Sequence, residues 1–176
     1  MADAERRRAF EALLQTHRKI VFKVAAVYAH GEEDRRDLAQ EIWLQVWRSF
    51  GGYDATRSFS TWMYRVALNV GLSHARRQRE GPQSLDVTLI DTLGGGTPID
   101  EPDERLAQLA RAIEMLEPLD RALILLYLDE QPYAEIAAVL GIGESNVGTR
   151  LARLRTRLRR DMTGAASSTG EKHGTR

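Results

Sequence analysis

The chain has no cysteine among its 176 residues. This absence excludes disulfides, thiolate metal sites and cysteine nucleophiles, and it fits a reducing compartment. No apolar run reaches the length of about 18 residues that a membrane-spanning helix needs. The charged N-terminus, residues 1–10, is not followed by the apolar stretch of a secretory signal. We therefore expect a cytoplasmic protein without membrane insertion.

The sequence also lacks the residue patterns of a catalytic or metal site. There is no glycine loop of the phosphate-binding type and no compact group of His, Asp and Glu. The histidines are scattered along the chain, at His17, His30, His74 and His173. We predict that the protein is not an enzyme and needs no metal and no cofactor.

Proline and glycine are rare except in one segment. Residues 5–80 contain no proline, show no alternation typical of strands, and are expected to be helical. Residues 81–104 contain three prolines and four glycines and are expected to form a flexible linker. Residues 105–162 return to helical periodicity, and the Ser/Thr/Gly-rich tail 163–176 is expected to be disordered. The predicted fold is all-α, with two small helical domains joined by a flexible linker.

Charge is distributed unevenly, although the net charge is zero. Residues 1–80 contain 14 Arg and Lys against 10 Asp and Glu, and residues 105–162 contain nine against eight. The segment 81–104 between them contains six acids and no base. Two basic-leaning blocks with an acidic connector are compatible with a nucleic-acid partner. The acidic connector could imitate a nucleic-acid backbone, or it could simply be a solvated tether.

A helix-turn-helix is predicted in the second domain. Helices are expected at residues 106–116 and 119–128, with Pro118 suited to the start of the second. In the segment 133–147, Ile136, Ala137 and Leu140 form an apolar face, and Gly141 falls where a helix ends in a left-handed residue. The small Ala137, the turn glycine and the apolar Val147 fit the tight crossing of this motif.

The second helix of the motif, residues 144–160, carries a basic row. Val147, Leu151, Leu154 and Leu158 form its expected buried stripe. The arginines lie on another face, at Arg150, Arg153, Arg157 and Arg160. Such a row can be an ordinary solvated face, but next to a helix-turn-helix it favours DNA binding, because arginine contacts phosphates and guanine.

The first domain contains a strongly amphipathic helix at residues 37–50. Leu38, Ile42, Val46 and Phe50 repeat every four residues, and Trp43 and Trp47 are expected to broaden that buried stripe. The polar residues share the opposite side with one leucine: Asp37, Gln40, Glu41, Leu44 and Arg48. This side is either a binding surface or the polar face of an ordinary surface helix.

A second helical segment, residues 58–79, combines aromatic and basic residues. Ser58 or Ser60 can cap it, and Met63, Val66 and Val70 are expected to face the core. Phe59, Trp62 and Tyr64 followed by Arg76, Arg77 and Arg79 suit single-stranded DNA, because rings stack on bases while arginines follow phosphates. Aromatic residues at this spacing can equally belong to a core.

The segments together resemble the extracytoplasmic function (ECF) group of bacterial sigma-70 factors. Residues 37–48 are similar to the region 2 helix that binds the largest polymerase subunit, and residues 59–69 to the segment that melts and reads the −10 element. Residues 116–129 and 133–160 are similar to region 4, which reads the −35 element. The resemblance covers residues 8–162 and implies three partners: core RNA polymerase, promoter DNA and an anti-sigma factor.

The resemblance assigns three groups of candidate residues by position. The core-polymerase group comprises Asp37, Gln40, Glu41, Leu44 and Arg48. The −10 group comprises Trp62, Tyr64, Arg65, Asn69, Arg76 and Arg77. The −35 group comprises Glu144, Ser145, Asn146, Gly148, Thr149, Arg150 and Arg153. Within these groups, Asn69 matches a position that captures a flipped base, although it could also cap a helix ahead of Gly71.

Two glycines depart from the family pattern and bear on the promoter contacts. The family often has Ser or Thr where Gly143 begins the recognition helix, and often Lys where Gly148 lies within it.

Three other interpretations of the whole chain make different predictions. A stand-alone helix-turn-helix regulator would bind a symmetric operator as a dimer, an enzyme would need a catalytic cluster, and a pure protein-interaction module would not need the arginine face.

Overall fold

The computed structural model describes residues 2–79 and 104–169. The described residues are helical and contain no strand, as the sequence predicts. The chain divides into two compact units, Met1–Ser84 and Leu85–Arg176, and each is described by itself. Within the described residues, no helix has both the length and the apolar character needed to cross a membrane.

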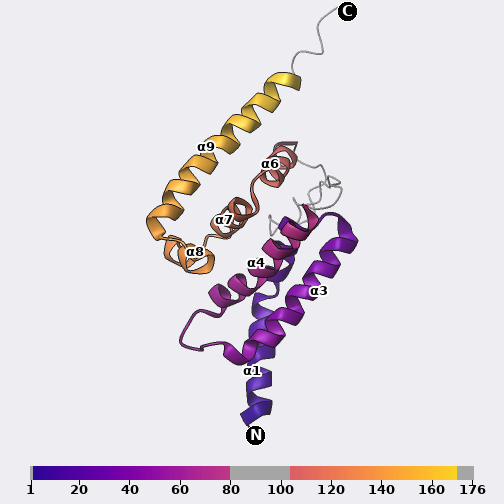
Figure 1. Cartoon of the computed structure of the whole chain (residues 1–176), viewed down its shortest axis with the longest axis vertical. Helices are drawn as coiled ribbons and strands as arrows, with labels where there is room; N and C mark the ends of the chain where they lie inside the picture. The colour runs from indigo at the N-terminus through magenta and orange to yellow at the C-terminus, as the bar shows by residue number, and fades with distance from the viewer. Residues whose placement is uncertain (1, 80–103, 170–176) are drawn as a thin grey trace, which may run out of the picture. The chain divides into compact units, whose positions relative to one another are not determined.

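The described residues of the first unit form four α-helices and one short 3₁₀ turn. Figure 1 labels α1, α3 and α4 among them. The helices are α1 (Ala2–His17), α2 (Lys19–Tyr28), α3 (Gly31–Ser49) and α4 (Phe59–Gln78), and the turn η1 spans Phe50–Gly52. Helices α2, α3 and α4 pack against one another in every pairing. Helix α2 is apolar over most of its circumference and is buried along nearly its whole length, so it forms the centre of the unit.

Local sequence explains where the helix α4 begins and how it packs. Ser58 is its N-cap, and the Ser58 hydroxyl accepts a hydrogen bond from the Thr61 backbone N–H at 3.4 Å. Gly71 lies in the middle of α4 against α2, where a Cβ would come within 2.6 Å of Tyr28 Cδ2. The missing side chain therefore allows the two helices to approach closely.

The second unit contains α6 (Glu104–Glu114), α7 (Pro118–Leu128), α8 (Tyr133–Leu140) and α9 (Glu144–Thr169) (Figure 1). Helix α9 packs against each of the other three. Pro118 occupies the start of α7, where its missing N–H costs nothing. The buried stripe predicted for α9 is confirmed, because its four members are at most 7 % exposed: Val147, Leu151, Leu154 and Leu158.

The predicted turn between α8 and α9 is also confirmed. Gly141 has φ 68° and ψ 34°, the left-handed conformation that glycine adopts without strain. The Ala137 carbonyl accepts hydrogen bonds from the backbone N–H groups of Gly141 and Ile142, which closes the end of α8. In α8, the fully buried residues are Ile136 and Val139, whereas the predicted Leu140 is only half-buried. The apolar face is thus rotated slightly from the expected one.

Two boundaries differ from the expected ones or fall outside the described residues. Helix α9 continues to Thr169, beyond the end at Arg160 that the sequence predicts, and no proline interrupts residues 161–169. The expected tail beyond residue 169 lies outside the described residues. The same holds for the predicted linker, apart from Glu104, which begins α6.

Candidate polymerase and nucleic-acid interfaces

Helix α3 separates its buried and exposed sides as the amphipathic pattern predicts. Leu38, Ile42 and Val46 are at most 1 % exposed. The five residues of the core-polymerase group are all exposed: Asp37, Gln40, Glu41, Leu44 and Arg48. The structure thus makes this group available at the surface of one helix, and its binding role remains a prediction.

Helix α3 also has an exposed apolar surface that the sequence pattern does not predict. Trp47 was expected in the buried stripe, but it is 53 % exposed, and Leu44, three residues earlier, is 50 % exposed. The Trp47 ring lies at the edge of the packed surface, with its centroid 5.5 Å from that of Phe10. Trp47 therefore adds apolar area beside Leu44, the apolar member of the core-polymerase group. An exposed apolar group of this kind is typical of an interaction site.

A cluster of aromatic rings surrounds the start of α4. The Phe10 and Phe50 centroids are 3.8 Å apart, and the Trp62 centroid lies 5.1 Å from Tyr53 and 5.2 Å from Phe59. Phe59 is buried, whereas Trp62 is half-buried at the rim of the cluster. Trp62 thus keeps part of its ring accessible while the cluster holds it in place.

Tyr64 is a correction to the predicted −10 group. Its side chain is only 1 % exposed and belongs to the core of the first unit. The helical period places it beside Met63, Ala67 and Leu68, which are also buried. A ring in this position cannot stack on a base. The alternative that aromatic residues here belong to the core holds for Tyr64 and Phe59.

The remaining −10 residues of α4 line up on an exposed face. Arg65, Asn69 and Arg76 are exposed and stand four and seven residues apart, so they follow one another along the helix surface. Helix α4 continues unbroken through Asn69 and Gly71 to Gln78. The alternative that Asn69 caps a helix is therefore wrong. The exposed Asn69 side chain does not cap a helix, and its contact with a base stays a prediction.

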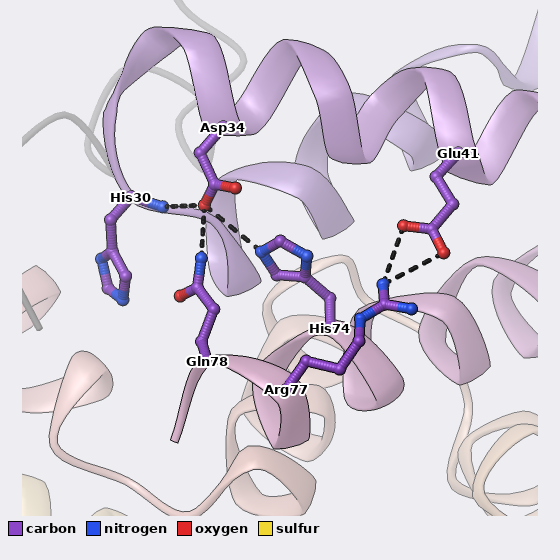
Figure 2. Close-up of polar contacts among 6 residues, drawn as sticks. All are labelled: His30, Asp34, Glu41, His74, Arg77 and Gln78. Atoms are coloured by element: carbon purple, nitrogen blue, oxygen red, sulfur yellow. Dashed lines mark hydrogen bonds and ion pairs between the residues drawn. The ribbon is translucent and has the colours of Figure 1, made fainter. Parts of the chain in front are cut away.

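Two polar contacts tie α4 to α3, and Figure 2 draws both. Arg77 donates to both carboxylate oxygens of Glu41, at 2.9 and 3.1 Å. This pair joins a residue of the −10 group to a residue of the core-polymerase group, which the sequence did not predict. Both side chains remain about half exposed, so the ion pair contributes little to stability.

The second contact is a partly buried network around Asp34. Its Oδ2 atom accepts from the His30 backbone N–H at 3.0 Å and from Gln78 Nε2 at 2.7 Å, and it lies 3.2 Å from His74 Nε2 (Figure 2). Burial raises the pKa of Asp34, but the hydrogen bonds from His30 and Gln78 and the contact with His74 outweigh it. The pKa of Asp34 is therefore below its usual value.

Helix α9 presents most of the −35 group to solvent. Its exposed members are Glu144, Ser145, Asn146, Thr149 and Arg153. Gly148 is half-buried, with Tyr133 Cε2 3.6 Å from the place of a Cβ. Further along, Arg157 and Arg160 both lie close to the Asp161 carboxylate, at 3.7 and 3.5 Å. That acid partly neutralises the end of the basic row.

Arg150 differs from its neighbours in the −35 group. Its Nη2 atom donates to Asp120 Oδ1 of α7 at 2.7 Å, and its side chain is only 33 % exposed. A second α7–α9 contact places the Arg155 guanidinium 5.9 Å from the centre of the Tyr127 ring. Sequence reasoning missed Asp120, since an acid in the first turn of a helix is common for other reasons.

Metal chemistry finds no support in the described part of the chain. Nowhere within residues 2–79 and 104–169 do three or more His, Cys, Asp or Glu side chains gather as a metal ion would require. Asp34 and His74 are close, but they form a hydrogen-bonded contact between helices. The site chemistry of both units is that of exposed helix faces, which suits macromolecular partners.

Comparison with protein families matches each unit to one description. "Sigma-70 region 2" matches residues 13–80, and "Sigma-70, region 4" matches residues 106–158. The ECF RNA polymerase sigma-E factor of Escherichia coli K12 is 31 % identical over 160 residues, which cover 84 % of this chain and 83 % of the relative. The RNA polymerase sigma-H factor of Pseudomonas aeruginosa is 28 % identical over 161 residues, covering 85 % and 83 %.

Two solved structures share the fold at low sequence identity. The sigma factor RpoE of Bartonella quintana, in complex with the anti-sigma factor NepR, aligns with a TM-score of 0.72 and 20 % identity, over 89 % of this chain and 98 % of that one. CnrH, in complex with the cytosolic domain of CnrY, aligns with a TM-score of 0.67 and 23 % identity, over 90 % of each chain.

Proposed function

The chain belongs to the extracytoplasmic function group of sigma-70 factors, and from this premise we propose how its two units share the work. The chain is an RNA polymerase sigma factor that directs promoter-specific transcription. The first unit binds core polymerase and helps to open and read the −10 element, and the second unit reads the −35 element. The observation that carries the proposal is the order of regions 2 and 4 on two separate helical units.

The exposed faces suit this division. In the first unit, the exposed α3 residues, with Leu44 and Trp47 among them, form the proposed polymerase contact. Arg65, Asn69 and Arg76 on α4 form the proposed −10 contact, with the half-buried Trp62 ring nearby to stack on a base. In the second unit, α9 enters the major groove of the −35 element with its exposed side toward the bases.

Joining two weak DNA contacts to one polymerase strengthens both. Once core polymerase holds the chain, each unit meets its promoter element at a high effective concentration. The combined binding energy then offsets strand opening, which costs about 1.4 kcal/mol for each base step. The acidic segment 81–104, which lies in the sequence between the residues matched by region 2 and those matched by region 4, acts as the tether in this scheme.

The partners and location follow from the same proposal. The protein works in the cytoplasm with core polymerase and has no catalytic activity of its own, because RNA synthesis belongs to the core enzyme. An anti-sigma factor is a further proposed partner, since the structurally similar sigma factor RpoE is bound to the anti-sigma factor NepR, and the structurally similar CnrH is bound to the cytosolic domain of CnrY.

Reconstitution with purified bacterial core polymerase tests the function. We expect a stoichiometric complex in gel filtration, and run-off transcription from genomic fragments should start at a defined set of promoters. The chain alone should bind the same DNA weakly. If no complex forms and the chain alone protects a palindromic operator, it acts as a stand-alone regulator instead.

A further inference from the structure

One ion pair in the second unit joins the first turn of α7 to the recognition helix α9. The bond between Arg150 Nη2 and Asp120 Oδ1 is 2.7 Å long and connects residues 30 positions apart. The two side chains are only 33 % and 17 % exposed. A charge-assisted bond that is partly shielded from water is stronger and better ordered than an exposed surface pair.

The Asp120–Arg150 pair restricts the rotation of α9 about its axis, which apolar packing alone does not. Val147 and Leu151 bury α9 in the core, but apolar contact is non-directional and tolerates small rotations of a helix about its axis. A guanidinium and a carboxylate meet in a defined planar geometry. Asp120 also lies at the positive end of α7, where a carboxylate is favoured. The contact therefore defines how far α9 is rotated relative to α7.

The rotation of α9 about its axis matters because the residues next to Arg150 on this helix are exposed, and the rotation sets the direction in which they point. Asn146, Thr149 and Arg153 stand within one turn of Arg150 and face solvent. A helix in a DNA groove reads bases only if these side chains point at the base edges. A misplacement of about one ångström is enough to weaken such contacts.

We propose that Asp120 and Arg150 are positioning residues that aim α9 at the −35 element. Arg150 is then committed to Asp120, and Asn146, Thr149 and Arg153 make the DNA contacts. This proposal rests on the proposed function, and it reassigns Arg150 from the direct DNA contact that its place in the −35 group implied.

The test uses the full chain with core polymerase on a promoter found by run-off transcription. The measured quantity is the discrimination ratio, the dissociation constant for a fragment with a scrambled −35 element divided by that for the intact fragment, over a range of salt concentrations. Asp120→Ala, Arg150→Ala and the double variant should each lower this ratio by about tenfold. The double variant should be no worse than either single one, because all three break the same pair.

The salt dependence separates positioning from direct contact. If Arg150 only positions α9, the slope of log affinity against log salt stays that of the wild type in Arg150→Ala, because no phosphate contact is lost. Arg153→Ala, a matched control on the same helix, should reduce the slope by about one. Unchanged or higher discrimination in folded Asp120→Ala would overturn the proposal, and an Arg150→Ala slope reduced by one would show that Arg150 contacts a phosphate itself and would overturn it as well.

The melting temperature of each variant shows whether it is still folded. Asp120→Asn keeps the shape of the side chain but removes its charge, and Arg150→Lys keeps the charge but removes the planar guanidinium. Each variant weakens the pair without leaving a cavity, so they give the same comparison if an alanine variant unfolds. The Asp120→Glu variant keeps the carboxylate and should restore most of the discrimination. A wild-type chain that shows no polymerase-dependent discrimination would contradict the proposed function itself, whereas normal discrimination in folded Asp120→Ala contradicts the positioning role alone.

Discussion

The two units present their candidate residues in different ways. In the first, two of them, Glu41 and Arg77, bind each other across α3 and α4, and a second contact between the same helices joins Asp34 to Gln78 and His74 (Figure 2). In the second, α9 alone carries the exposed group, and its orientation depends on a turn glycine and the Asp120–Arg150 pair. The first unit thus builds a surface from two interlocked helices, and the second presents one helix on a small support.

This difference predicts which functions a substitution in each unit should impair. A change between α3 and α4 should disturb the polymerase and −10 surfaces together, because the same residues connect them. A change on the exposed side of α9 should affect DNA recognition with little effect on stability. Four experiments sharpen or break this comparison.

The largest effect is expected for the core-polymerase group. Asp37→Arg combined with Glu41→Arg should abolish binding to core polymerase, because like charges at a charged interface cost several kcal/mol. Asp37→Arg alone leaves the Glu41–Arg77 pair in place and should already weaken binding strongly. The measurement is core affinity by gel shift or gel filtration, with helicity followed by circular dichroism.

The matched control on α3 is Glu32→Arg. Glu32 is exposed and pairs with Arg36 one turn later, away from the core-polymerase group. Core affinity should survive this change. Equal affinities for all three variants would mean that the proposed surface is an ordinary solvated face.

Two glycine substitutions compare the packing of the units. Gly71→Ala should destabilise the first unit by about 1–3 kcal/mol, because its Cβ would lie 2.6 Å from Tyr28 Cδ2 and 3.1 Å from Val24 Cγ1. Gly148→Ala meets only an ordinary contact with Tyr133 and should stabilise α9 by about 1 kcal/mol through helix propensity. Chemical denaturation measures both. A neutral Gly71→Ala would show that α2 and α4 can separate without cost.

Asn69→Ala tests base contact on the exposed face of α4. Because Asn69 is exposed in mid-helix, its loss should leave core binding and the melting temperature unchanged. Open-complex formation should fall about tenfold, the value of one hydrogen bond of about 1.4 kcal/mol. If the defect persists on a pre-melted bubble and depends on the −10 base, Asn69 reads that base. A lowered melting temperature with no base dependence would end this assignment.

The smallest effect concerns the Asp34 network and pH. The lowered pKa of Asp34 means that its carboxylate stabilises the folded state. This contribution is complete above the unfolded-state pKa and is lost as the pH falls through the folded-state pKa, that is, below about pH 4. Asp34→Asn should cost about 1 kcal/mol at neutral pH and should flatten the fall in unfolding free energy between pH 5 and pH 2. An unchanged acid limb would exclude Asp34 as a contributor.

Comparison of predicted and observed helices shows where the sequence is sufficient. The period of Val147, Leu151, Leu154 and Leu158 predicts the buried side of α9 because 3.6 residues per turn leaves no other common face. Gly141 predicts the turn because glycine adopts the left-handed conformation without strain. The Ser58 cap follows from local hydrogen bonding in the same way. These features depend on neighbours within about one or two turns.

Features that depend on distant neighbours could not be predicted in this way. Tyr64 and Trp62 are both aromatic and two residues apart, yet Tyr64 is buried and Trp62 reaches the rim, because burial depends on which helices cover each side. The sequence pattern also predicts Trp47 in the core and leaves open whether Asn69 caps a helix. Neither point can be decided from one helix without the elements packed against it.

The sequence by itself determined the helical class, the turn of the helix-turn-helix, the buried stripes and the family to which the chain belongs. Those properties rest on local periodicity, glycine conformation and motif order. Only the tertiary structure decided that Glu41 meets Arg77, that Asp34 binds Gln78, and that Arg150 is held by Asp120. The partners in these pairs are 30 or more residues apart, and a charged side chain finds its partner only after the helices have packed.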